Sequence, residues 1–454
     1  MLNEKQKEIN EKLHAFVKEK GDNLFLVTGY AGTGKTYLAT YFVKEVIDKT
    51  YKRIAITAPT NKAVKVLRNL STFDPNDVSF LTIHSLLGLK EDVDENGKQV
   101  FVNNWEADNQ IEYYDIVIID ESSMLSEELF EMVIKYKDIV KFIFLGDDAQ
   151  IPPLNHTYSP VLDPKVIEEL EIHKEELTEI IRQKEDSPIL GLATYVRNNL
   201  LSPLPVPRRH RENTDEEGVY FLNFFTDEQK GNIHELLTNL FKSEDFKEDS
   251  DYVKVLAWTN DVVNRFNESI RKILFGENIK QIEIGERLVA NKPIFGKMDV
   301  IDFSTNDEFE VINYEIKNKR ANRKSFKTYL TQVSHFDVYT QSNVHKYINI
   351  LHDDDKEKYN ETCNELKEAA LKFIKGSDDA RKAWKKYYRF LKKFADVKYA
   401  YAMTSHKSQG STYDHCIVFE DDIDRNRNIF ERNRIKYTAF TRPRKNLYIL
   451  TNKR

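Results

Sequence analysis

Residues 24–36 have the sequence LFLVTGYAGTGKT, in which an apolar run leads into a glycine-rich loop that ends in Lys-Thr. The run is short and rich in β-branched and aromatic side chains, which predicts a buried strand. The amphipathic stretch at 37–48 predicts a helix directly after the loop. In this order of strand, loop and helix, backbone N–H groups can surround a phosphate at a helix N-terminus. The stretch therefore predicts a nucleoside triphosphate site at the end of a parallel strand.

The loop matches the pattern G-x4-G-K-[ST] at each defined position. Its residues are Gly29, Tyr30, Ala31, Gly32, Thr33, Gly34, Lys35 and Thr36. In such a loop the glycines let the backbone curl around a β-phosphate, Lys35 neutralises β- and γ-phosphate oxygens, and Thr36 supplies a hydroxyl to Mg²⁺. ATP and Mg²⁺ are therefore the expected cofactors. The alternative, a glycine-rich turn that arose by chance, does not explain the strand and the helix on either side.

Two later strand ends carry polar groups that such a site uses. The apolar run 115–120 ends in Asp120 and is followed by Glu121. Asp120 would belong to the Mg²⁺ shell and Glu121 would polarise the attacking water, although acidic residues after a strand also serve as helix caps. The run 141–145 leads to Gln150, whose amide would sense the γ-phosphate; a polar turn residue is the alternative.

Apolar runs recur between amphipathic stretches, which is the pattern of an α/β fold. The first set of expected parallel strands comprises 24–28, 53–58, 115–120 and 141–145. The second set comprises 253–257, 397–402, 415–419 and 446–450. Two α/β sheets are therefore expected, one on each side of the middle of the chain.

Two segments predict protruding hairpins. Residues 89–104 have apolar positions on both sides of Asn96-Gly97, which predicts a β-hairpin with a two-residue turn. Residues 354–395 predict a helical hairpin with a break and cap at Gly376 and Ser377. Its second helix is basic and aromatic. We expect the aromatic stripe to be the seam between the helices and the basic face to complement the acidic first helix, with DNA binding as the alternative.

The composition is that of a globular protein with several domains: 454 residues, 40% hydrophobic and 31% charged. No run of roughly 18 apolar residues occurs and the first 16 residues lack a signal-peptide core, so a cytoplasmic location and no membrane partner are expected. Cys363 and Cys416 have no spacing that indicates a disulfide framework or a zinc module. With a net charge of -6, any nucleic-acid binding must use a local surface.

Eight ordered segments resemble the motifs of superfamily 1 helicases. They are the loop at 29–36, TAPTNKAV at 57–64, TIHSLLGL at 82–89, IIDESSM at 118–124, LGDDAQIPPL at 145–154, EIIRQ at 179–183, MTSHKSQGSTYD at 403–414 and YTAFTRPRKNLYIL at 437–450. Within that superfamily the chain resembles the RecD-like branch, most closely the Dda-type helicases of bacteriophages. The resemblance spans nearly the whole chain. It implies two RecA-like motor domains with ATP between them, 5′-to-3′ DNA helicase activity, and a phage protein in the host cytoplasm.

The resemblance also implies a domain organisation. The first RecA-like domain would comprise 1–85 and 107–185, with 86–106 inserted as a pin hairpin. The second would comprise 186–277 and 399–454, with 278–398 inserted as a small SH3-like β-barrel that carries the helical hairpin.

Several site residues are expected from the resemblance alone. Arg182 and Arg442 would reach the γ-phosphate from the second motor domain, although isolated arginines are more often surface ion pairs. Gln6 resembles an adenine-reading glutamine, with a solvated helix face as the alternative.

Single-stranded DNA would cross both motor domains away from the nucleotide. The expected contacts are Pro59, Thr60, Asn61, His84, Ser405, His406 and Gln409. Their polar groups suit phosphate contacts without sequence readout. Trp258 would stack on a base or belong to the core. Phe101 would meet a base pair at a junction of single- and double-stranded DNA, or pack under its own hairpin, and the helical hairpin would brace it.

Two other classes of function remain open on the residues. One is a P-loop ATPase that remodels a protein or RNA, or phosphorylates a small molecule, without unwinding DNA. The other is a nucleic-acid binder built on an inactive motor, which the presence of Lys35, Asp120 and Glu121 disfavours. Replication or recombination proteins are candidate partners of a helicase.

Overall fold

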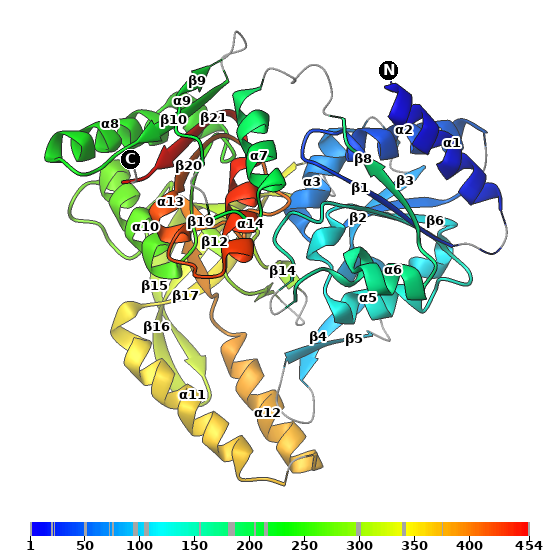
Figure 1. The fold of residues 1–454 in the computed structure, drawn as a ribbon. Coiled ribbons are helices and arrows are strands. Elements are labelled where there is room, and N and C mark those ends of the chain that lie inside the picture. The colour runs from blue at the N-terminus through cyan, green and yellow to red at the C-terminus, as the bar shows by residue number, and fades with distance from the viewer. Residues whose placement is uncertain are drawn as a thin grey trace. The chain divides into compact units, whose positions relative to one another are not determined.

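The computed structural model describes the chain except at residues 1, 20, 22, 50–51, 72, 75–76, 94–98, 104–108, 154–155, 180–186, 204–205, 213–216, 297–300, 338–341, 375 and 453–454. At 90–93, 99–103 and 337 it describes the backbone alone. The chain divides into two compact units (Figure 1). The larger unit comprises Met1–Leu87, Asn109–Leu274 and Tyr401–Arg454, and the smaller comprises Gly88–Asp108 and Phe275–Ala400.

The first sheet of the larger unit is parallel throughout, in the order β3-β2-β6-β7-β1-β8. Its strands are β1 (Leu24–Gly29), β2 (Ile54–Ala58), β3 (Val78–Thr82), β6 (Ile116–Ile119), β7 (Lys141–Gly146) and β8 (His173–Leu177). The accompanying helices are α1 (Glu4–Lys18), α2 (Lys35–Lys49), α3 (Asn61–Asn69), α4 (Ile83–Leu86), α5 (Glu127–Ile134) and α6 (Pro164–Glu169). Every residue of β1, β2 and β6 is buried, as expected of strands covered on both faces. The four strands predicted for this sheet are confirmed.

The second sheet of the larger unit has the order β19-β11-β20-β21-β10-β9 and is parallel except at the β10–β9 edge. Its strands are β9 (Arg211–Glu212), β10 (Gly218–Leu222), β11 (Val253–Ala257), β19 (Ala402–Thr404), β20 (Tyr413–Phe419) and β21 (Pro443–Leu450). The accompanying helices are α7 (Pro188–Asn198), α8 (Asp227–Phe241), α9 (Glu244–Glu248), α10 (Asn260–Phe275), α13 (Glu420–Ile423) and α14 (Ile429–Phe440). The α/β class with two parallel sheets is confirmed.

The strand predicted at 397–402 is wrong as a single element. Residues Val397–Tyr399 form β18 in an antiparallel sheet of the smaller unit, whereas Ala402 begins β19 of the second parallel sheet. Between them Tyr401 is buried, and Asn267 Oδ1 accepts the backbone N–H groups of Tyr401 at 3.1 Å and Ala402 at 2.9 Å. The run reads as one strand because β18 is half-buried and β19 is buried, but the chain passes from one unit to the other within it.

The smaller unit contains a five-stranded antiparallel sheet in the order β17-β16-β15-β12-β18. Its remaining strands are β12 (Arg287–Ala290), β15 (Glu308–Ala321), β16 (Lys324–Asp337) and β17 (Ser342–Leu351), with a separate pair β13 (Ile294–Phe295) and β14 (Ile301–Phe303). One core cluster, which includes Leu288, Phe309 and Val333, packs within this unit.

Both predicted hairpins are present in the smaller unit. The antiparallel pair β4 (Leu89–Val93) and β5 (Gln99–Asn103) forms the β-hairpin, and its Asn96-Gly97 turn lies outside the described residues. Helices α11 (Lys356–Leu371) and α12 (Asp378–Leu391) form the helical hairpin (Figure 1). Gly376 has φ 84°, and Ser377 is the N-cap of α12. Helix α12 lies against β4, so the expected contact between the two hairpins is confirmed.

Within the described residues, no helix combines the length and the apolar character that crossing a bilayer requires.

Candidate active site

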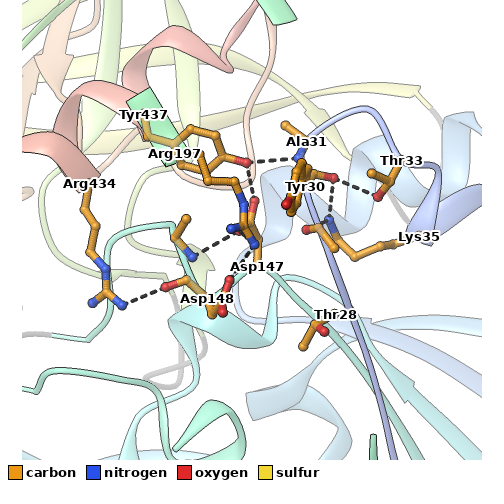
Figure 2. A network of polar contacts seen from close by, with 12 residues as sticks. Thr28, Tyr30, Ala31, Thr33, Lys35, Asp147, Asp148, Arg197, Arg434 and Tyr437 are labelled. Atoms are coloured by element: carbon orange, nitrogen blue, oxygen red, sulfur yellow. Dashed lines mark hydrogen bonds and ion pairs between the residues drawn. The ribbon is translucent and has the colours of Figure 1, made fainter. Parts of the chain in front are cut away.

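The glycine-rich loop joins β1 to α2, and β1 lies between β7 and β8. Gly32 has φ +81°, a left-handed conformation, and a Cβ there would approach Leu190 Cδ1 to 2.9 Å. Only glycine therefore fits this bend of the loop without strain or displacement. Lys35 Nζ donates to the carbonyl oxygens of Gly29 at 2.7 Å and Tyr30 at 3.0 Å (Figure 2). The lysine amine thus lies over the loop in which phosphates bind.

The donors expected to hold Mg²⁺ lie together. Thr36 Oγ1 donates to Asp120 Oδ2 at 2.7 Å, and the backbone N–H of Glu121 donates to Asp120 Oδ1 at 2.7 Å. A hydroxyl and a carboxylate are oxygen ligands that suit Mg²⁺, which keeps waters and substrate phosphates as its other ligands. The described residues contain no cluster of three or more His, Cys, Asp or Glu able to hold a metal by themselves. The residues therefore fit a magnesium ion that arrives with a nucleotide.

Glu121 lies at the end of the Asp120 strand in a left-handed conformation, with φ 52° and ψ 37°. This conformation is costly for a side chain with a Cβ, and strain of this kind clusters at active sites. Burial raises the pKa of Glu121; the nearby Arg442 charge opposes the shift and Asp120 adds to it. Burial also raises the pKa of Asp120. The carboxylates are therefore held where a cation or a reacting water would offset their desolvation.

Arg442 follows α14 of the second sheet, yet its charge acts on Glu121 of the first. Arg442 is 4% exposed, and its guanidinium donates to Thr438 O at 2.9 Å, Ser411 O at 3.2 Å and Thr441 Oγ1 at 2.9 Å. These neutral acceptors fix the group without neutralising it. The structure therefore brings Arg442, the expected arginine, close enough to Glu121 for its charge to act on that carboxylate. Arg182 lies outside the described residues.

Gln150 lies in the segment that follows β7 and is 6% exposed. Within the described structure its Oε1 has no hydrogen-bond partner. An unpaired buried amide oxygen is costly, which indicates a group retained for a ligand or a water. A polar turn residue would instead be solvated or paired.

A polar network joins the two sheets beside the loop (Figure 2). Tyr437 of α14 accepts a hydrogen bond from the backbone N–H of Ala31 at 3.0 Å and donates to Asp147 Oδ2 at 2.5 Å. The guanidinium of Arg197, on α7, lies 3.9 Å from the ring centroid of Tyr30 and 3.6 Å from Asp147 Oδ1. Burial, together with Asp147, raises the pKa of Tyr437 well above its ordinary value, so the hydroxyl stays protonated.

Asp148 extends this network. Its Oδ1 lies 2.6 Å from Arg197 Nη2, and its carbonyl accepts from Arg434 Nη2 at 2.6 Å. Sequence reasoning missed Asp147, Arg197 and Tyr437 as site residues. Asp147 and Tyr437 lie within quoted motifs, which was the available signal, but Arg197 lies outside all of them.

Gln6 contacts the nucleotide loop from α1. It is 1% exposed, and its Nε2 donates to Thr33 O at 3.0 Å while its Oε1 accepts from the backbone N–H of Asn3 at 3.1 Å. The alternative of a solvated helix face is therefore wrong.

The expected DNA-contacting residues lie at the ends of strands in both sheets. Pro59, Thr60 and Asn61 follow β2, and the Thr60 hydroxyl caps α3 by accepting from Ala63 N at 3.2 Å. His84 lies in α4, and burial lowers its pKa. Thr60 and the start of α3 adjoin Gly410 of the motif at 403–414: a Cβ at Gly410 would lie 3.0 Å from Ala63 Cβ and 3.6 Å from Thr60 Oγ1, so glycine permits this close approach.

On the second sheet the expected contacts differ in exposure. Ser405 is fully buried and its hydroxyl donates to Ala257 O at 3.2 Å. Gln409 Nε2 donates to the carbonyl oxygen of Ile151 at 2.7 Å, in the segment that follows β7 of the first sheet. His406 is half-buried, and burial lowers its pKa. In this structure the Ser405 and Gln409 side chains thus hold the fold, whereas His406 keeps accessible surface.

The two aromatic candidates have different settings. Trp258 is partly buried against the core of the second sheet, and Asp422 Oδ2 accepts its backbone N–H at 2.9 Å. Phe101 pairs with Glu91 in the β4–β5 hairpin, and its side chain lies outside the described part of the structure.

Comparison with known proteins gives two matching family models: the AAA domain at residues 13–156 and the UvrD-like helicase C-terminal domain at 399–450. The chain is 26% identical to an uncharacterized protein, R530, of Acanthamoeba polyphaga mimivirus, over 97% of both chains. It is also 26% identical to the ATP-dependent DNA helicase dda of enterobacteria phage T4, over 92% of both chains.

A RecBCD enzyme subunit RecD from Buchnera aphidicola is 24% identical over 95% of this chain and 71% of its own. The solved structure of the Pif1 helicase from Candida albicans shares the fold, with a TM-score of 0.52, 17% identity, and coverage of 99% of this chain and 94% of that chain. With the ordered motifs and the two parallel sheets, these likenesses make the chain similar to the superfamily 1 helicases, in the branch that contains RecD and Dda.

Proposed function

We propose that this protein is an ATP-dependent DNA helicase that moves 5′ to 3′ on single-stranded DNA and unwinds duplex DNA. One observation carries the proposal: Arg442 of the second sheet acts on Glu121 beside the nucleotide loop of the first. A site shared between two parallel sheets makes their approach depend on the nucleotide, which is how hydrolysis can drive movement. The relative in phage T4 is named as an ATP-dependent DNA helicase.

Each residue of the site has a role in the proposed hydrolysis of ATP. Lys35 exchanges its carbonyl partners for phosphate oxygens, while Thr36 and Asp120 would hold the Mg²⁺ that accompanies ATP. When bound, Mg²⁺ would supply positive charge that offsets the negative charge of the phosphates. Glu121 orients the attacking water. Arg442 stabilises the charge that spreads over the γ-phosphoryl oxygens, with Arg182 as a second candidate.

The path of DNA is part of the proposal. Single-stranded DNA contacts Asn61 and His84 on the first sheet and His406 on the second, whose surfaces remain at least partly accessible. Pro59 and Thr60 position the chain at the contact on the first sheet. Ser405 and Gln409 support the contact at His406 on the second sheet through their buried hydrogen bonds. Gln6 reads adenine once nucleotide displaces its present partners, and Trp258 stacks on a base with its accessible edge.

The insertions act on the duplex. We assign the β4–β5 hairpin as the pin and Phe101 as its contact with the junction of single- and double-stranded DNA. We also assign the antiparallel sheet with β13–β14 as the small SH3-like barrel of the branch, and α11–α12 as the brace, which the sheet order and the contact of α12 with β4 support. Replication, recombination or repair of DNA is the setting in which this activity serves, with proteins of those processes as candidate partners.

The test is the rate of ATP hydrolysis with and without single-stranded DNA, together with unwinding of duplexes that carry either a 5′ or a 3′ tail. We expect strong DNA stimulation and unwinding from the 5′ tail alone. A P-loop ATPase that remodels a protein or RNA would show no DNA stimulation. Preferential unwinding from the 3′ tail would refute the polarity but not the motor.

A further inference from the structure

Helix α12 has two sharply different faces. Its buried residues, Ala380, Trp384 and Phe390, lie on one side, and Phe390 packs with Leu366 of α11 in a common core cluster. Its basic residues, including two in the turn that ends the helix, are Arg381, Lys382, Lys385, Lys386, Arg389, Lys392 and Lys393. At about 100° per residue, these seven positions fall within an arc of about 140°. The helix therefore presents one basic stripe away from its seam.

The stripe is exposed and largely uncompensated. Six of its seven side chains are exposed, and the seventh, Lys392, lies over the Phe295 ring at 3.9 Å. Among the described residues the stripe makes one ion pair, Arg381 with Asp378 at 3.4 Å. Burial and the nearby Lys393 charge lower the pKa of Lys319, so like charges crowd the C-terminal end of the stripe.

The expected complement between the acidic and basic helices is wrong within the described residues. Glu365 of α11 pairs with Lys324 of β16 at 2.8 Å, and no ion pair joins α11 to α12. The aromatic seam, in contrast, is confirmed: Tyr359 of α11 stacks on Phe390 with ring centroids 5.3 Å apart. Apolar packing thus holds the two helices of the hairpin together. Within the described residues, the basic side chains of α12 form no ion pair with α11.

The chemistry of the stripe fits a regular array of phosphates. From Arg381 to Lys393 the stripe extends about 18 Å at 1.5 Å per residue, and duplex DNA carries one charge per about 1.7 Å of its axis. Surfaces that bind single strands combine basic groups with aromatic platforms for the bases. Here Trp384 and Phe390 are buried, and the half-buried Tyr388 packs against the rings of Trp384 and Tyr387. A basic stripe whose neighbouring aromatic rings pack on one another therefore favours the duplex backbone.

We propose that the basic stripe of α12 binds the sugar-phosphate backbone of the duplex arm at a fork. This inference rests on the proposed helicase function and adds the element that holds the unopened DNA. Helix α12 lies against β4 of the pin hairpin within one compact unit, so the stripe and the pin are held near one another. Binding to phosphates alone keeps the grip independent of sequence and allows the duplex to slide.

The test compares Lys382→Gln/Lys385→Gln/Lys386→Gln with a matched triple on α11, Lys356→Gln/Lys367→Gln/Lys372→Gln. Both triples remove three exposed positive charges from the same hairpin. Binding is measured to single-stranded DNA, blunt duplex and a fork over a series of salt concentrations, with circular dichroism as the folding control. We expect the α12 triple to weaken duplex and fork binding by about tenfold and to reduce the salt slope by about one for each phosphate that is no longer neutralised.

Binding of single-stranded DNA and the ATPase activity that it stimulates should stay unchanged in the α12 triple. Equal loss in both triples would show a net-charge effect and overturn the assignment of the stripe. Unchanged duplex and fork binding would overturn it as well, and equal loss on single strands would make the stripe a single-strand track. If the unaltered protein shows no ATPase response to single-stranded DNA, the proposed function fails instead, and this outcome is distinct from all the others.

Discussion

The hydroxyl of Tyr437 donates a 2.5 Å hydrogen bond to Asp147 Oδ2, linking the last helix of the second sheet to the segment after β7 of the first. The hydroxyl oxygen of Tyr437 also accepts a hydrogen bond from the backbone N–H of Ala31 in the nucleotide loop. Arg442 lies just beyond the end of α14, which carries Tyr437. The bond therefore links the helix that precedes Arg442, the proposed catalytic arginine, to the nucleotide loop.

Tyr437→Phe removes this bridge and leaves the Asp147 carboxylate with the Arg197 ion pair and the backbone N–H of Ala149. A hydrogen bond to a charged group contributes about 1.5–3 kcal/mol, so we expect kcat for DNA-stimulated ATP hydrolysis to fall by about tenfold or more. The KM for ATP should change little, because the phosphate loop remains. Tyr347→Phe, at an exposed residue, is the control. An unchanged kcat would show that the bridge is structural only.

Lys35→Ala and Glu121→Gln should both abolish hydrolysis, for different reasons. Loss of the Lys35 amine removes the charge that neutralises the phosphates, so ATP binding weakens too. Glu121→Gln keeps the phosphate loop and should bind ATP normally while losing activation of the water. Binding of a fluorescent ATP analogue alongside a phosphate-release assay separates the two. Turnover near that of the unaltered protein in Glu121→Gln would remove Glu121 from the mechanism.

Glu121→Gln should also change the pH dependence of stability. Burial raises the pKa of Glu121 above its ordinary value of 4.5, so its favourable contribution to folding is present below that pH and is lost as the pH rises through the raised pKa. At pH 7.5 without nucleotide, glutamine should therefore raise the melting temperature, by about 1–3 °C. The difference should disappear near pH 4.5. The exposed Glu128→Gln is the control, and a lower melting temperature at pH 7.5 would contradict the expectation.

Arg442→Ala should retain binding of nucleotide and DNA but lose DNA-stimulated turnover by at least ~10²-fold, the effect typical of arginines that stabilise phosphoryl transfer. Equilibrium binding and steady-state ATPase rates measure the two properties on the same preparations. Arg444→Ala, two residues along and exposed at a surface pair with Asp414, is a suitable control. A loss smaller than about threefold would place Arg442 outside the site.

Phe101→Ala should slow unwinding sharply while leaving single-strand translocation and DNA-stimulated ATPase nearly intact. Opening a base pair costs on the order of 1–2 kcal/mol in stacking, which an apolar side chain at the junction can offset by stacking on the exposed base. Deletion of the α11–α12 hairpin, which lies against β4, should reproduce the defect. If either change reduced translocation and unwinding equally, Phe101 would belong to the track or to the core.

Features that depend on neighbouring residues could be predicted from the sequence. The loop at 29–36, the buried strands on either side of it and the cap at Ser377 each depend on hydrogen bonds or apolar patterns within a few residues. Asp120 and Glu121 were identifiable because a strand end fixes where their side chains emerge. Arg442 could be identified only from the order of the motifs, because no local pattern distinguishes it from a surface arginine.

Contacts between groups that are distant in the sequence follow from the packing of the two sheets. Tyr437 and Ala31 are 406 residues apart, and nothing near either one specifies the other. Arg197 belongs to no motif, and the positive charge of α12 has no acidic partner on α11 within the described residues. The physical reason is that burial and hydrophobic period are properties of a segment, whereas a hydrogen bond or an ion pair needs two particular atoms within about 3–4 Å, and only the packing of the two sheets selects them.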